Sequence, residues 1–463
     1  MNTLTEDLHY ISERVNHLRA HFNSAQTRSY EWRVTQLSQL KKMLVEQEQS
    51  FLQALASDLA KSEYEAWTTE IGFTISDIDH TLKHLEKWMK PRKVSTPLIA
   101  HPAKSYQLPE PLGTVLIIGA WNYPIQLVLA PLVAAISAGN CAVMKPSELA
   151  PACSELLAKL LPKYLCNDSF WVLEGAVAET TEVLKQKFDH IMYTGGEGVA
   201  KIVMRAAAEH LTPVTLELGG KSPCIIDNDC NLDMTAARIV WNKWMNAGQT
   251  CVAPDYVIIE ESQSQAFIDI LKSKITQFYG NDIKHNQDYG RIINTRHLTR
   301  LVSYLAGQNI VIGGEHDTQK KYLEPTVVLD PDLDSQLMLD EIFGPILPII
   351  TVEKIADAIS LINHRAKPLA LYVYTKNTEF ENYVLNFTSS GNVCINDGMM
   401  FMANPNLPFG GVGSSGMGQY HGQAGFDTFS HLKTVMKRST LLDPALRYPP
   451  FTEIKLTLLK KLL

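Results

Sequence analysis

The chain has 463 residues, of which 45% are apolar and 20% charged, so it has the composition of a soluble globular protein with room for two or three domains. A net charge of −7 and the lack of any run of about 18 apolar residues argue against nucleic acid as a partner and against a transmembrane segment. The seven cysteines are odd in number, include no C-x-x-C pair and follow no secretory signal, so we expect a reducing, cytoplasmic setting.

Residues 1–90 are predicted to be helical, because apolar residues recur at helical spacing from Glu31 to Lys61 and again from Ile71 to Trp88. His80 and His84 lie one helical turn apart in the second run and could share a metal ion. No third ligand is evident, so a surface or packing role is the favoured interpretation and we predict no metal site.

Residues 91–111 carry five prolines and predict an extended arm that pairs with another chain or domain. From Gly113 onward, short apolar strands alternate with helices, which is typical of a doubly wound parallel sheet. The expected strands are 114–118, 141–144, 170–173, 190–193 and 214–216, and the expected helices are 125–138, 150–161, 180–187 and 199–210.

A second alternating region begins after Gly220 and predicts another α/β domain. Residues 404–418 are rich in Gly, Pro and Ser and predict a loop. The tail from Ile454 to Leu463 predicts a short amphipathic helix, which docks on the protein itself or makes a weak contact with a membrane surface. The expected strands are 224–226, 256–260, 326–329, 346–351, 370–374 and 393–396, and the expected helices are 234–245, 265–279, 295–306 and 355–364.

Two glycine-containing turns follow predicted strands, at the strand ends where doubly wound sheets bind ligands. Gly119–Pro124 places a proline at the first turn of the next helix. Thr194–Gly198 opens another helix, whose free N–H groups favour an anion such as a phosphate. The second turn lacks the G-x-G-x-x-G fingerprint, so an ordinary tight turn stays open as an alternative.

The stretch Asn246–Pro254 presents Cys251 after a small polar run and shortly before a proline. Gly248 permits backbone conformations closed to other residues, and Pro254 does not suit an ordinary helix or central strand, so we predict an ordered loop. A thiol in such a loop suits nucleophilic chemistry if its surroundings stabilise the thiolate. The alternative is that Cys251 is one more small buried hydrophobic residue.

Seven short motifs carry a further inference. They are Gly119–Pro124, Lys145–Glu148, Phe188–Gly195, Leu216–Pro223, Gly248–Cys251, Glu341–Pro345 and Pro408–Gly413. Together and in this order they resemble the aldehyde dehydrogenase superfamily, most closely its class 3 branch of fatty and aromatic aldehyde dehydrogenases. The likeness covers nearly the whole chain.

The resemblance implies roles for particular residues. Cys251 would be the nucleophile, Glu217 the general base and Asn122 the side-chain donor of an oxyanion hole. The family usually has a glycine where this chain has Ala200, so one methyl group is added to the turn near the cofactor phosphates. NAD or NADP would be bound by Lys145, Glu148, Thr194, Gly195, Gly196, Leu218, Glu341 and Phe343.

These residue types suit the oxidation of an aldehyde to a carboxylic acid. A thiolate adds to the carbonyl carbon, the resulting oxyanion collapses as hydride leaves for nicotinamide, and water hydrolyses the thioester. The oxyanion needs preorganised donors, here the amide of Asn122 and the main-chain N–H of Cys251. A glutamate whose pKa is raised by burial, here Glu217, can activate the water.

Bulky apolar side chains flank the active motifs and predict a tunnel for medium-chain, long-chain or aromatic aldehydes. A core position for half of them is an equally open interpretation. The candidates, with one neighbouring threonine, are Tyr123, Trp241, Trp244, Met245, Thr250, Met399, Met400 and Phe401.

We therefore predict an α/β protein of the aldehyde dehydrogenase-like fold, and the class 3 resemblance implies a homodimer. Two alternatives stay open, a CoA-acylating aldehyde dehydrogenase and a non-catalytic binding protein on the same scaffold. A cysteine hydrolase finds no histidine motif in its support. The expected parts are a Rossmann-like cofactor domain (1–90 and 112–217), an α/β catalytic domain (218–417), a small β bridging and oligomerisation arm (91–111 and 418–440) and a C-terminal tail (441–463).

Overall fold

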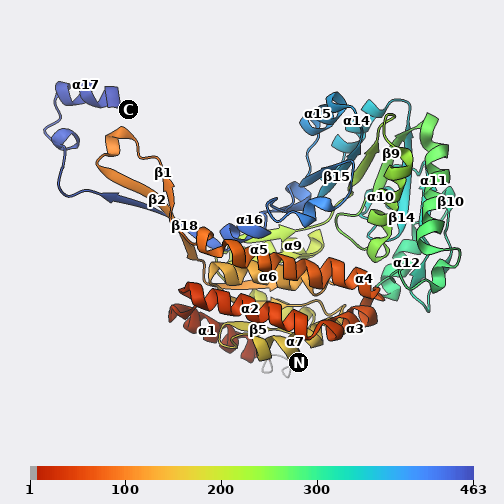
Figure 1. Ribbon diagram of the computed structural model, residues 1–463, viewed down its shortest axis with the longest axis horizontal. Helices are drawn as coiled ribbons and strands as arrows, with labels where there is room; N and C mark the ends of the chain where they lie inside the picture. The colour runs from red at the N-terminus through yellow and green to blue at the C-terminus, as the bar shows by residue number, and fades with distance from the viewer. Residues whose placement is uncertain (1–7, 463) are drawn as a thin grey trace.

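The computed structural model describes residues 8–462, which form a six-stranded sheet, a seven-stranded sheet, a three-stranded sheet and a two-stranded ribbon (Figure 1). The helical run predicted from Glu31 to Lys61 is present but divided between two helices. The Ser29 hydroxyl caps one of them by accepting a main-chain amide, and Ala60 ends the other in a left-handed conformation (φ 53°). The first helices are α1 (His9–Asn23), α2 (Tyr30–Glu46), α3 (Glu48–Leu59), α4 (Glu63–Ala66) and α5 (Gly72–Trp88).

The six-stranded sheet contains every strand predicted between Gly113 and Gly220, each within one residue of its expected ends. Its strands are β3 (Thr114–Ile118), β4 (Cys141–Lys145), β5 (Phe170–Val172), β6 (His190–Thr194), β7 (Val214–Glu217) and β17 (Gly416–Met417). The intervening helices are α6 (Gln126–Ala138), α7 (Pro151–Tyr164), α8 (Val177–Leu184) and α9 (Glu197–Ala208). The strand order is β17-β7-β6-β3-β4-β5, and all neighbours are parallel except β17 and β7.

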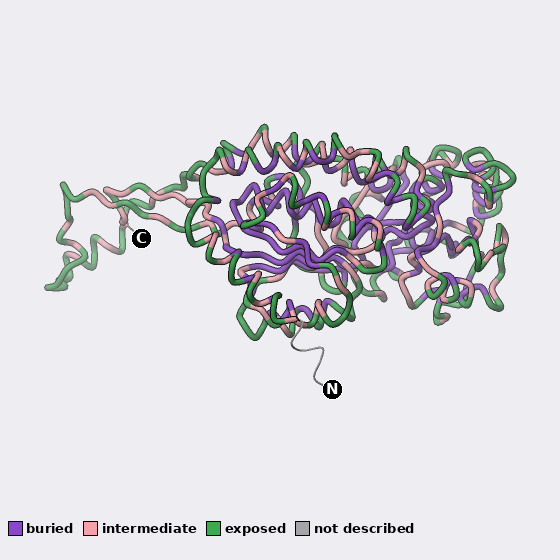
Figure 2. Tube along the Cα trace, turned by 90° about the horizontal axis from the view of Figure 1, so that it is seen from below, coloured by how far each residue is buried: buried purple, intermediate pink, exposed green. Residues whose placement is uncertain are grey.

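Both faces of this sheet are covered, because alternate residues of a strand enter different cores. Val115 and Ile117 pack with helices α2, α3, α5, α6 and α7, whereas Leu116 and Ile118 pack with α1, α8 and α9. Figure 2 shows the buried strands between the two helical layers. The strand ends that carry the predicted turns therefore meet at one edge of a fully enclosed sheet.

The seven-stranded sheet confirms the second α/β region. Its strands are β8 (Pro223–Ile226), β9 (Tyr256–Glu260), β10 (Ile310–Ile312), β13 (Thr326–Leu329), β14 (Ile346–Val352), β15 (Ala370–Tyr374) and β16 (Asn392–Ile395). The order is β10-β13-β14-β9-β8-β15-β16, and all neighbours are parallel except β10 and β13. The helices of this region are α10 (Leu232–Trp244), α11 (Glu261–Tyr279), α12 (Thr295–Ser303), α13 (Gln336–Leu339), α14 (Ala358–Asn363) and α15 (Thr378–Phe387).

Several short elements were not predicted. Strand β10 and the ribbon β11 (His316–Asp317) and β12 (Tyr322–Leu323) have only two or three residues each, too few to show a period. Strand β17 lies in the predicted loop 404–418 and within the predicted catalytic domain, yet it pairs with β7. Gly416 stands opposite Glu217 in this pairing, so the chain returns to the six-stranded sheet after completing the other one.

The expected arm is a three-stranded antiparallel sheet that projects from the rest of the molecule (Figure 1). It consists of β1 (Arg92–Val94), β2 (Ala103–Pro111) and β18 (Ser430–Arg438), and β2 pairs with β18 along its whole length. The first half of the segment 418–440 differs from the expected extended conformation. Helix α16 (Gly422–Thr428) forms there and packs against α5 and α6, because Phe426 enters the core.

The predicted helix in the tail is present as α17 (Glu453–Leu462), and it lies at the far end of the arm beside the turn Leu98–Ala100 (Figure 1). Its apolar side chains are largely uncovered, since Ile454 is 74% and Leu456 is 53% exposed. Across residues 8–462, no helix combines the length and the apolarity that crossing a membrane requires.

Candidate active site

Cys251 lies in a loop between α10 and β9, as predicted. Three consecutive residues before it have left-handed backbone conformations, namely Asn246 (φ 52°), Ala247 (φ 51°) and Gly248 (φ 74°). A side chain at Gly248 would also come within 2.2 Å of the carbonyl oxygen of Gly344, so both conformation and space require glycine.

The buried side chain of Gln249 fixes this loop. Its amide nitrogen donates to the carbonyl oxygens of Asn246 at 3.0 Å and Arg291 at 2.9 Å. Its amide oxygen accepts the main-chain N–H of Ile293 at 2.9 Å. All three bonds are made in a buried place, where they are costly to lose, so the backbone that leads into Cys251 is held in one conformation.

The surroundings of Cys251 favour the neutral thiol. Removal from water raises its pKa to about 12, and the nearby carboxyl groups of Glu341 and Glu217 add to this shift. The main-chain N–H groups of Cys251 and Val252 oppose it. The thiol therefore needs a proton acceptor before it can act as a nucleophile.

Asn122 lies in the turn after β3 and is 2% exposed. Its side-chain nitrogen donates to the carbonyl oxygen of Gln249 at 3.1 Å, which places the amide beside the backbone two residues before Cys251. The main-chain carbonyl oxygen of Asn122 accepts a hydrogen bond from the side-chain nitrogen of Asn246 at 2.8 Å. A primary amide has two N–H groups and this arrangement uses one, so Asn122 retains a donor for a ligand.

Glu217 ends strand β7 and is 3% exposed. Neither of its carboxyl oxygens has a hydrogen-bond partner among residues 8–462. Burial raises its pKa well above the usual value of 4.5. A buried carboxyl group without partners is rare in folded proteins and indicates a group kept for a ligand or for proton transfer.

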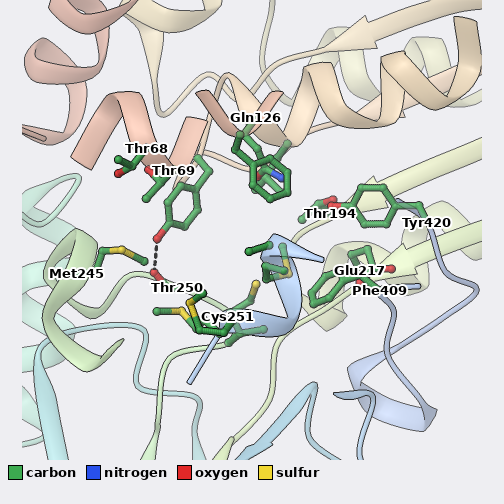
Figure 3. A pocket seen from close by; sticks show the side chains of 18 of the residues that line it. Thr68, Thr69, Gln126, Thr194, Glu217, Met245, Thr250, Cys251, Phe409 and Tyr420 are labelled. Atoms are coloured by element: carbon green, nitrogen blue, oxygen red, sulfur yellow. Dashed lines mark hydrogen bonds between the residues drawn. The ribbon is translucent and has the colours of Figure 1, made fainter. Parts of the chain in front are cut away.

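Two cavities meet at these residues. One has a volume of about 910 Å³ and mainly apolar walls, and the other has a volume of about 990 Å³. Cys251, Glu217 and Thr194 are the three residues that line both. Figure 3 shows Glu217 and Thr194 on one side of the apolar cavity, with Cys251 facing them. Molecules bound in the two cavities would therefore meet at the thiol.

The second cavity lies against the N-terminus of α9, where the predicted turn provides open space. Thr194, Gly195 and Gly196 line it. Apart from chain neighbours and the backbone of α9 itself, no atom of residues 8–462 lies within 4 Å of the position that a Cβ at Gly196 or Gly198 would take. The first turn of α9 has no side-chain cap, so its N–H groups can donate hydrogen bonds to the oxygens of a phosphate. These features fit the pyrophosphate of a dinucleotide.

Ala200 does not narrow this turn. Its methyl group is 2% exposed and belongs to the core between α9 and the sheet. Since the side chain points into the protein, the departure from the family's usual glycine leaves the space at the N-terminus of α9 unchanged.

Lys145 and Glu148 form a pair at the end of β4, with 3.5 Å between their charged groups. Lys145 is buried, whereas the Glu148 side chain is 46% exposed. Burial lowers the pKa of Lys145, and Glu148 opposes that shift. Neither residue lines the second cavity itself, so the predicted ribose site would lie beside it, further along the sheet edge.

Leu218, Glu341 and Phe343 all line the second cavity, as the predicted cofactor role requires. The carboxyl group of Glu341 lies over Gly219, where a side chain would come within 2.1 Å of its oxygen. Removal from water raises the pKa of Glu341 to about 8. Phe343 has a left-handed backbone (φ 48°), and its ring makes an edge contact with Trp121 at 5.2 Å.

Six of the eight predicted substrate residues line the apolar cavity. They are Tyr123, Trp241, Met245, Thr250, Met399 and Met400. The prediction for Phe401 is wrong, because its ring stacks on those of Tyr372 and Phe409 and does not reach the cavity wall. Trp244 is a core residue, 1% exposed, whose indole donates to the carbonyl of Pro345.

Sequence reasoning missed a polar group in the wall of the apolar cavity. Gln126 and Tyr420 line it (Figure 3), and both residues are buried. No local sequence pattern indicates Gln126 or Tyr420, because Gln126 lies in an apolar helix and Tyr420 lies in the loop before α16.

The two histidines that could have shared a metal ion lie elsewhere. The rings of His80 and His84 are 4.3 Å apart and pack beside Trp88.

A thiol-dependent oxidoreductase suits this geometry, since an organic substrate and a dinucleotide could approach one sulfur from two cavities. The comparisons with known proteins agree. The model of the aldehyde dehydrogenase family matches residues 7–435.

Two relatives and one solved structure illustrate the likeness. The chain is 49% identical to aldehyde dehydrogenase family 3 member A2 of Mus musculus over 96% of this chain and 93% of that protein. It is 46% identical to the dimeric NADP-preferring aldehyde dehydrogenase of Canis lupus familiaris, over 95% of this chain and 98% of that one. A structure of the substrate-bound state of Staphylococcus aureus AldH superposes with a TM-score of 0.95 at 44% identity, covering 97% and 99% of the two chains. The chain belongs to the aldehyde dehydrogenase family.

Proposed function

We propose that this protein oxidises aldehydes to free carboxylic acids with NAD⁺ or NADP⁺, with Cys251 as nucleophile, Glu217 as general base and Asn122 as oxyanion donor. The observation that carries the proposal is the position of Cys251 and Glu217 in the walls of both cavities. Only such residues can act on an aldehyde in one cavity while a nicotinamide group occupies the other.

The first half of the reaction forms a bond to sulfur. Cys251 gives its proton to solvent, and the main-chain N–H groups of Cys251 and Val252 help to stabilise the thiolate. The sulfur bonds to the carbonyl carbon, and the carbonyl electron pair moves to oxygen, where the free N–H of Asn122 and the main-chain N–H of Cys251 donate to it. The oxyanion collapses to re-form the carbonyl as hydride leaves the carbon, and a bound nicotinamide would supply the acceptor for that hydride. The acyl group then stays on sulfur as a thioester.

The second half releases the acid. The Glu217 carboxylate takes a proton from a water molecule, whose oxygen bonds to the acyl carbon. The carbon–sulfur bond breaks, and the sulfur leaves with its electron pair as a thiolate. The buried carboxyl group of Glu217 distinguishes this reaction from acyl transfer to CoA, which needs no such base.

The substrate class follows from the apolar cavity. Its walls offer aromatic rings and thioethers next to Cys251, so medium-chain, long-chain or aromatic aldehydes are favoured over acetaldehyde. Burial of each methylene contributes about 0.8 kcal/mol, so affinity should rise with chain length until the cavity is filled.

The names of relatives support proposals about the cofactor and the oligomeric state. One relative is named as a dimeric, NADP-preferring enzyme, so we propose a homodimer that accepts NADP⁺ as well as NAD⁺. The projecting arm offers a long three-stranded sheet for such an assembly. Glu148 favours NAD⁺, because its carboxylate would repel a 2′-phosphate at the ribose.

Two further proposals concern the setting of the protein. The seven cysteines all carry free thiols, which supports a reducing cytoplasmic location. The exposed apolar residues of α17 lie beside Lys455 and Lys460, which supports a weak contact with an anionic membrane surface.

The decisive experiment combines purified protein, a series of aldehydes, and either NAD⁺ or NADP⁺, with and without CoA. We expect reduced cofactor and a free acid in equal amounts without CoA. An absolute need for CoA would favour the acylating alternative, and no reduction with any aldehyde would favour a binding protein. The Cys251→Ser variant controls for contaminating activity and should be inactive.

A further inference from the structure

Lys61 and Glu70 form an ion pair that is completely buried, with 2.5 Å between Nζ and Oε1 and no exposed surface on either side chain. Neither residue takes part in the chemistry proposed above. Two charges are costly to remove from water, and the attraction between them often does no more than offset that cost. Such a pair therefore calls for an explanation other than stability.

The pair forms hydrogen bonds at both ends of the turn that carries Asn122. The Lys61 ammonium group donates to the carbonyl oxygen of Asn122 at 3.0 Å. The second oxygen of Glu70 accepts the main-chain N–H groups of Ile125 at 2.8 Å and Gln126 at 3.2 Å. These two N–H groups belong to the start of α6, which has no local side-chain cap, so Glu70 supplies the missing acceptor.

The same ammonium group reaches the next residue and the cysteine loop. It lies 3.9 Å from the centre of the Tyr123 ring, a cation–π contact. The carbonyl oxygen of Asn122 that it binds also accepts the side-chain N–H of Asn246, which in turn donates to the carbonyl of Gln249. Lys61 thus ties the turn after β3 to the loop before Cys251.

The local structure explains how the Lys61 side chain reaches the turn after β3. Helix α3 ends at Ala60, whose left-handed conformation turns the chain and directs the following lysine inward. Glu70 lies in the π-helical segment Trp67–Ile71 that follows α4, only nine positions after Lys61 in the sequence. The pair is therefore formed within one short stretch of chain, in which Thr68 and Thr69 line the apolar cavity but Lys61 and Glu70 do not.

We propose that Lys61 and Glu70 are positioning residues that hold the Asn122 amide at the distance and angle the oxyanion requires. This inference rests on the proposed role of Asn122. Loss of one oxyanion donor costs about 10²–10³ in kcat, and a displacement of about 1 Å can cost about 10²-fold. Without the pair, the turn would keep Asn122 but lose the contacts that fix its backbone.

The test uses Lys61→Met/Glu70→Leu, which replaces the pair by apolar side chains of similar size. Such replacements of buried pairs are often neutral for stability, but Glu70→Leu also removes the acceptor of two main-chain N–H groups, so the melting temperature should fall, as in the Arg33→Met control below. We expect the pre-steady-state burst of reduced cofactor to slow about 100-fold. Alkylation of Cys251 by iodoacetamide should change less than threefold, because the thiol itself is untouched. If the double variant does not fold, Glu70→Gln makes the same comparison with a milder change.

A double-mutant cycle with Asn122→Ala separates positioning from general damage. If the pair acts through Asn122, its removal in the Asn122→Ala background should slow the burst less than threefold. Arg33→Met is the matched control. This buried cation binds the carbonyl of Ser137 at the opposite end of α6, so its loss should lower the melting temperature and leave the burst within twofold.

The outcomes are distinct. A parent-like burst in Lys61→Met/Glu70→Leu, with a slow burst in Asn122→Ala, would overturn the inference and leave the proposed function intact. A 100-fold loss that persists in the Asn122→Ala background would also overturn it, because the pair would act elsewhere. A parent-like burst in Asn122→Ala would remove the oxyanion role and the inference together.

Discussion

The hydroxyl groups of Tyr123 and Thr250 lie 2.7 Å apart and join the residue after Asn122 to the residue before Cys251 (Figure 3, dashed line). The first belongs to a turn of the six-stranded sheet and the second to a loop that leads into the seven-stranded sheet. The candidate donor and the candidate nucleophile are therefore locked to one another by contacts between two parts of the fold. The environments of five residues, Cys251, Glu217, Trp241, Glu148 and Ala200, lead to the predictions below.

The pKa of about 12 for Cys251 can be measured in the cofactor-free protein. Below the pKa, the thiolate fraction rises tenfold for each pH unit, so the rate of alkylation should rise tenfold per unit from pH 7 to pH 10. The rate for Cys251→Ser, subtracted at each pH, accounts for the other thiols. A plateau near pH 8 would contradict the buried environment described for this thiol.

Glu217→Gln should separate the two halves of the reaction. Without a base for water, the acyl-enzyme should accumulate after a normal burst, and steady turnover should fall by about 10²–10⁴-fold. Mass spectrometry of the quenched protein would detect the thioester on Cys251. The exposed Glu209, changed to Gln, is the control and should behave as the parent does. If both the burst and the trapped acyl group were absent, the proposed role of Glu217 in deacylation would be contradicted.

The same substitution should change how stability depends on pH. Burial raises the folded-state pKa of Glu217, so its contribution to the free energy of unfolding is fully present below about pH 4.5 and is lost as the pH rises through the folded pKa. The melting temperature of Glu217→Gln should therefore rise relative to that of the parent as the pH increases from 5 to 9. A constant difference across this range would contradict the raised pKa.

Trp241→Ala tests the wall of the apolar cavity. The side chain is 43% exposed, so part of its ring is free to contact an alkyl chain. We expect KM for long-chain aldehydes to rise roughly 10-fold and KM for acetaldehyde to change less than twofold. Phe401→Leu, which changes a ring behind the wall, is the control. Equal changes for both aldehydes in Trp241→Ala would show that the ring is not part of the wall.

Glu148→Gln tests the choice between the two dinucleotides. Removing the partly exposed carboxylate should raise kcat/KM for NADP⁺ relative to NAD⁺ by about 3- to 10-fold, because repulsion of the 2′-phosphate is lost. The gain should shrink at high ionic strength, since salt screens an exposed charge. An unchanged ratio would place the ribose away from Lys145 and Glu148.

Ala200→Gly tests whether the departure from the family pattern affects the cofactor. Because the methyl group is buried in the core and not in the turn, its loss should cost about 1 kcal/mol of stability and leave KM for the cofactor within twofold. Chemical denaturation and steady-state kinetics measure the two effects. A tenfold change in KM would mean that the methyl group does reach the phosphate site.

Much of the fold could be predicted because its signals are local. The strand Thr114–Ile118 is a short, wholly apolar run, and the loop around Cys251 is marked by Gly248 and Pro254. Helix α15 was missed although Asn377 caps it, because only Phe380 and Val384 are buried and a single turn of spacing is a weak signal.

The part of the site that escaped prediction depends on contacts between distant segments. Nothing near Lys61 in the sequence indicates that its ammonium group binds the carbonyl of Asn122, 61 positions away. Phe401 was misplaced for a related reason. It lies between Met400 and Met402, which both line the apolar cavity, and sequence alone does not say which neighbour turns away.

The pairing of Gly416 with Glu217 has a consequence for folding during synthesis on the ribosome. Strand β7 is made roughly 200 residues before β17, and ribosomes add about 5–20 residues per second, so the open side of β7 waits about 10–40 seconds for its neighbour. During that interval a half-finished polypeptide displays an unpaired strand next to the future catalytic carboxylate. Chaperone binding to nascent chains should concentrate there, and it should end once synthesis has passed residue 417.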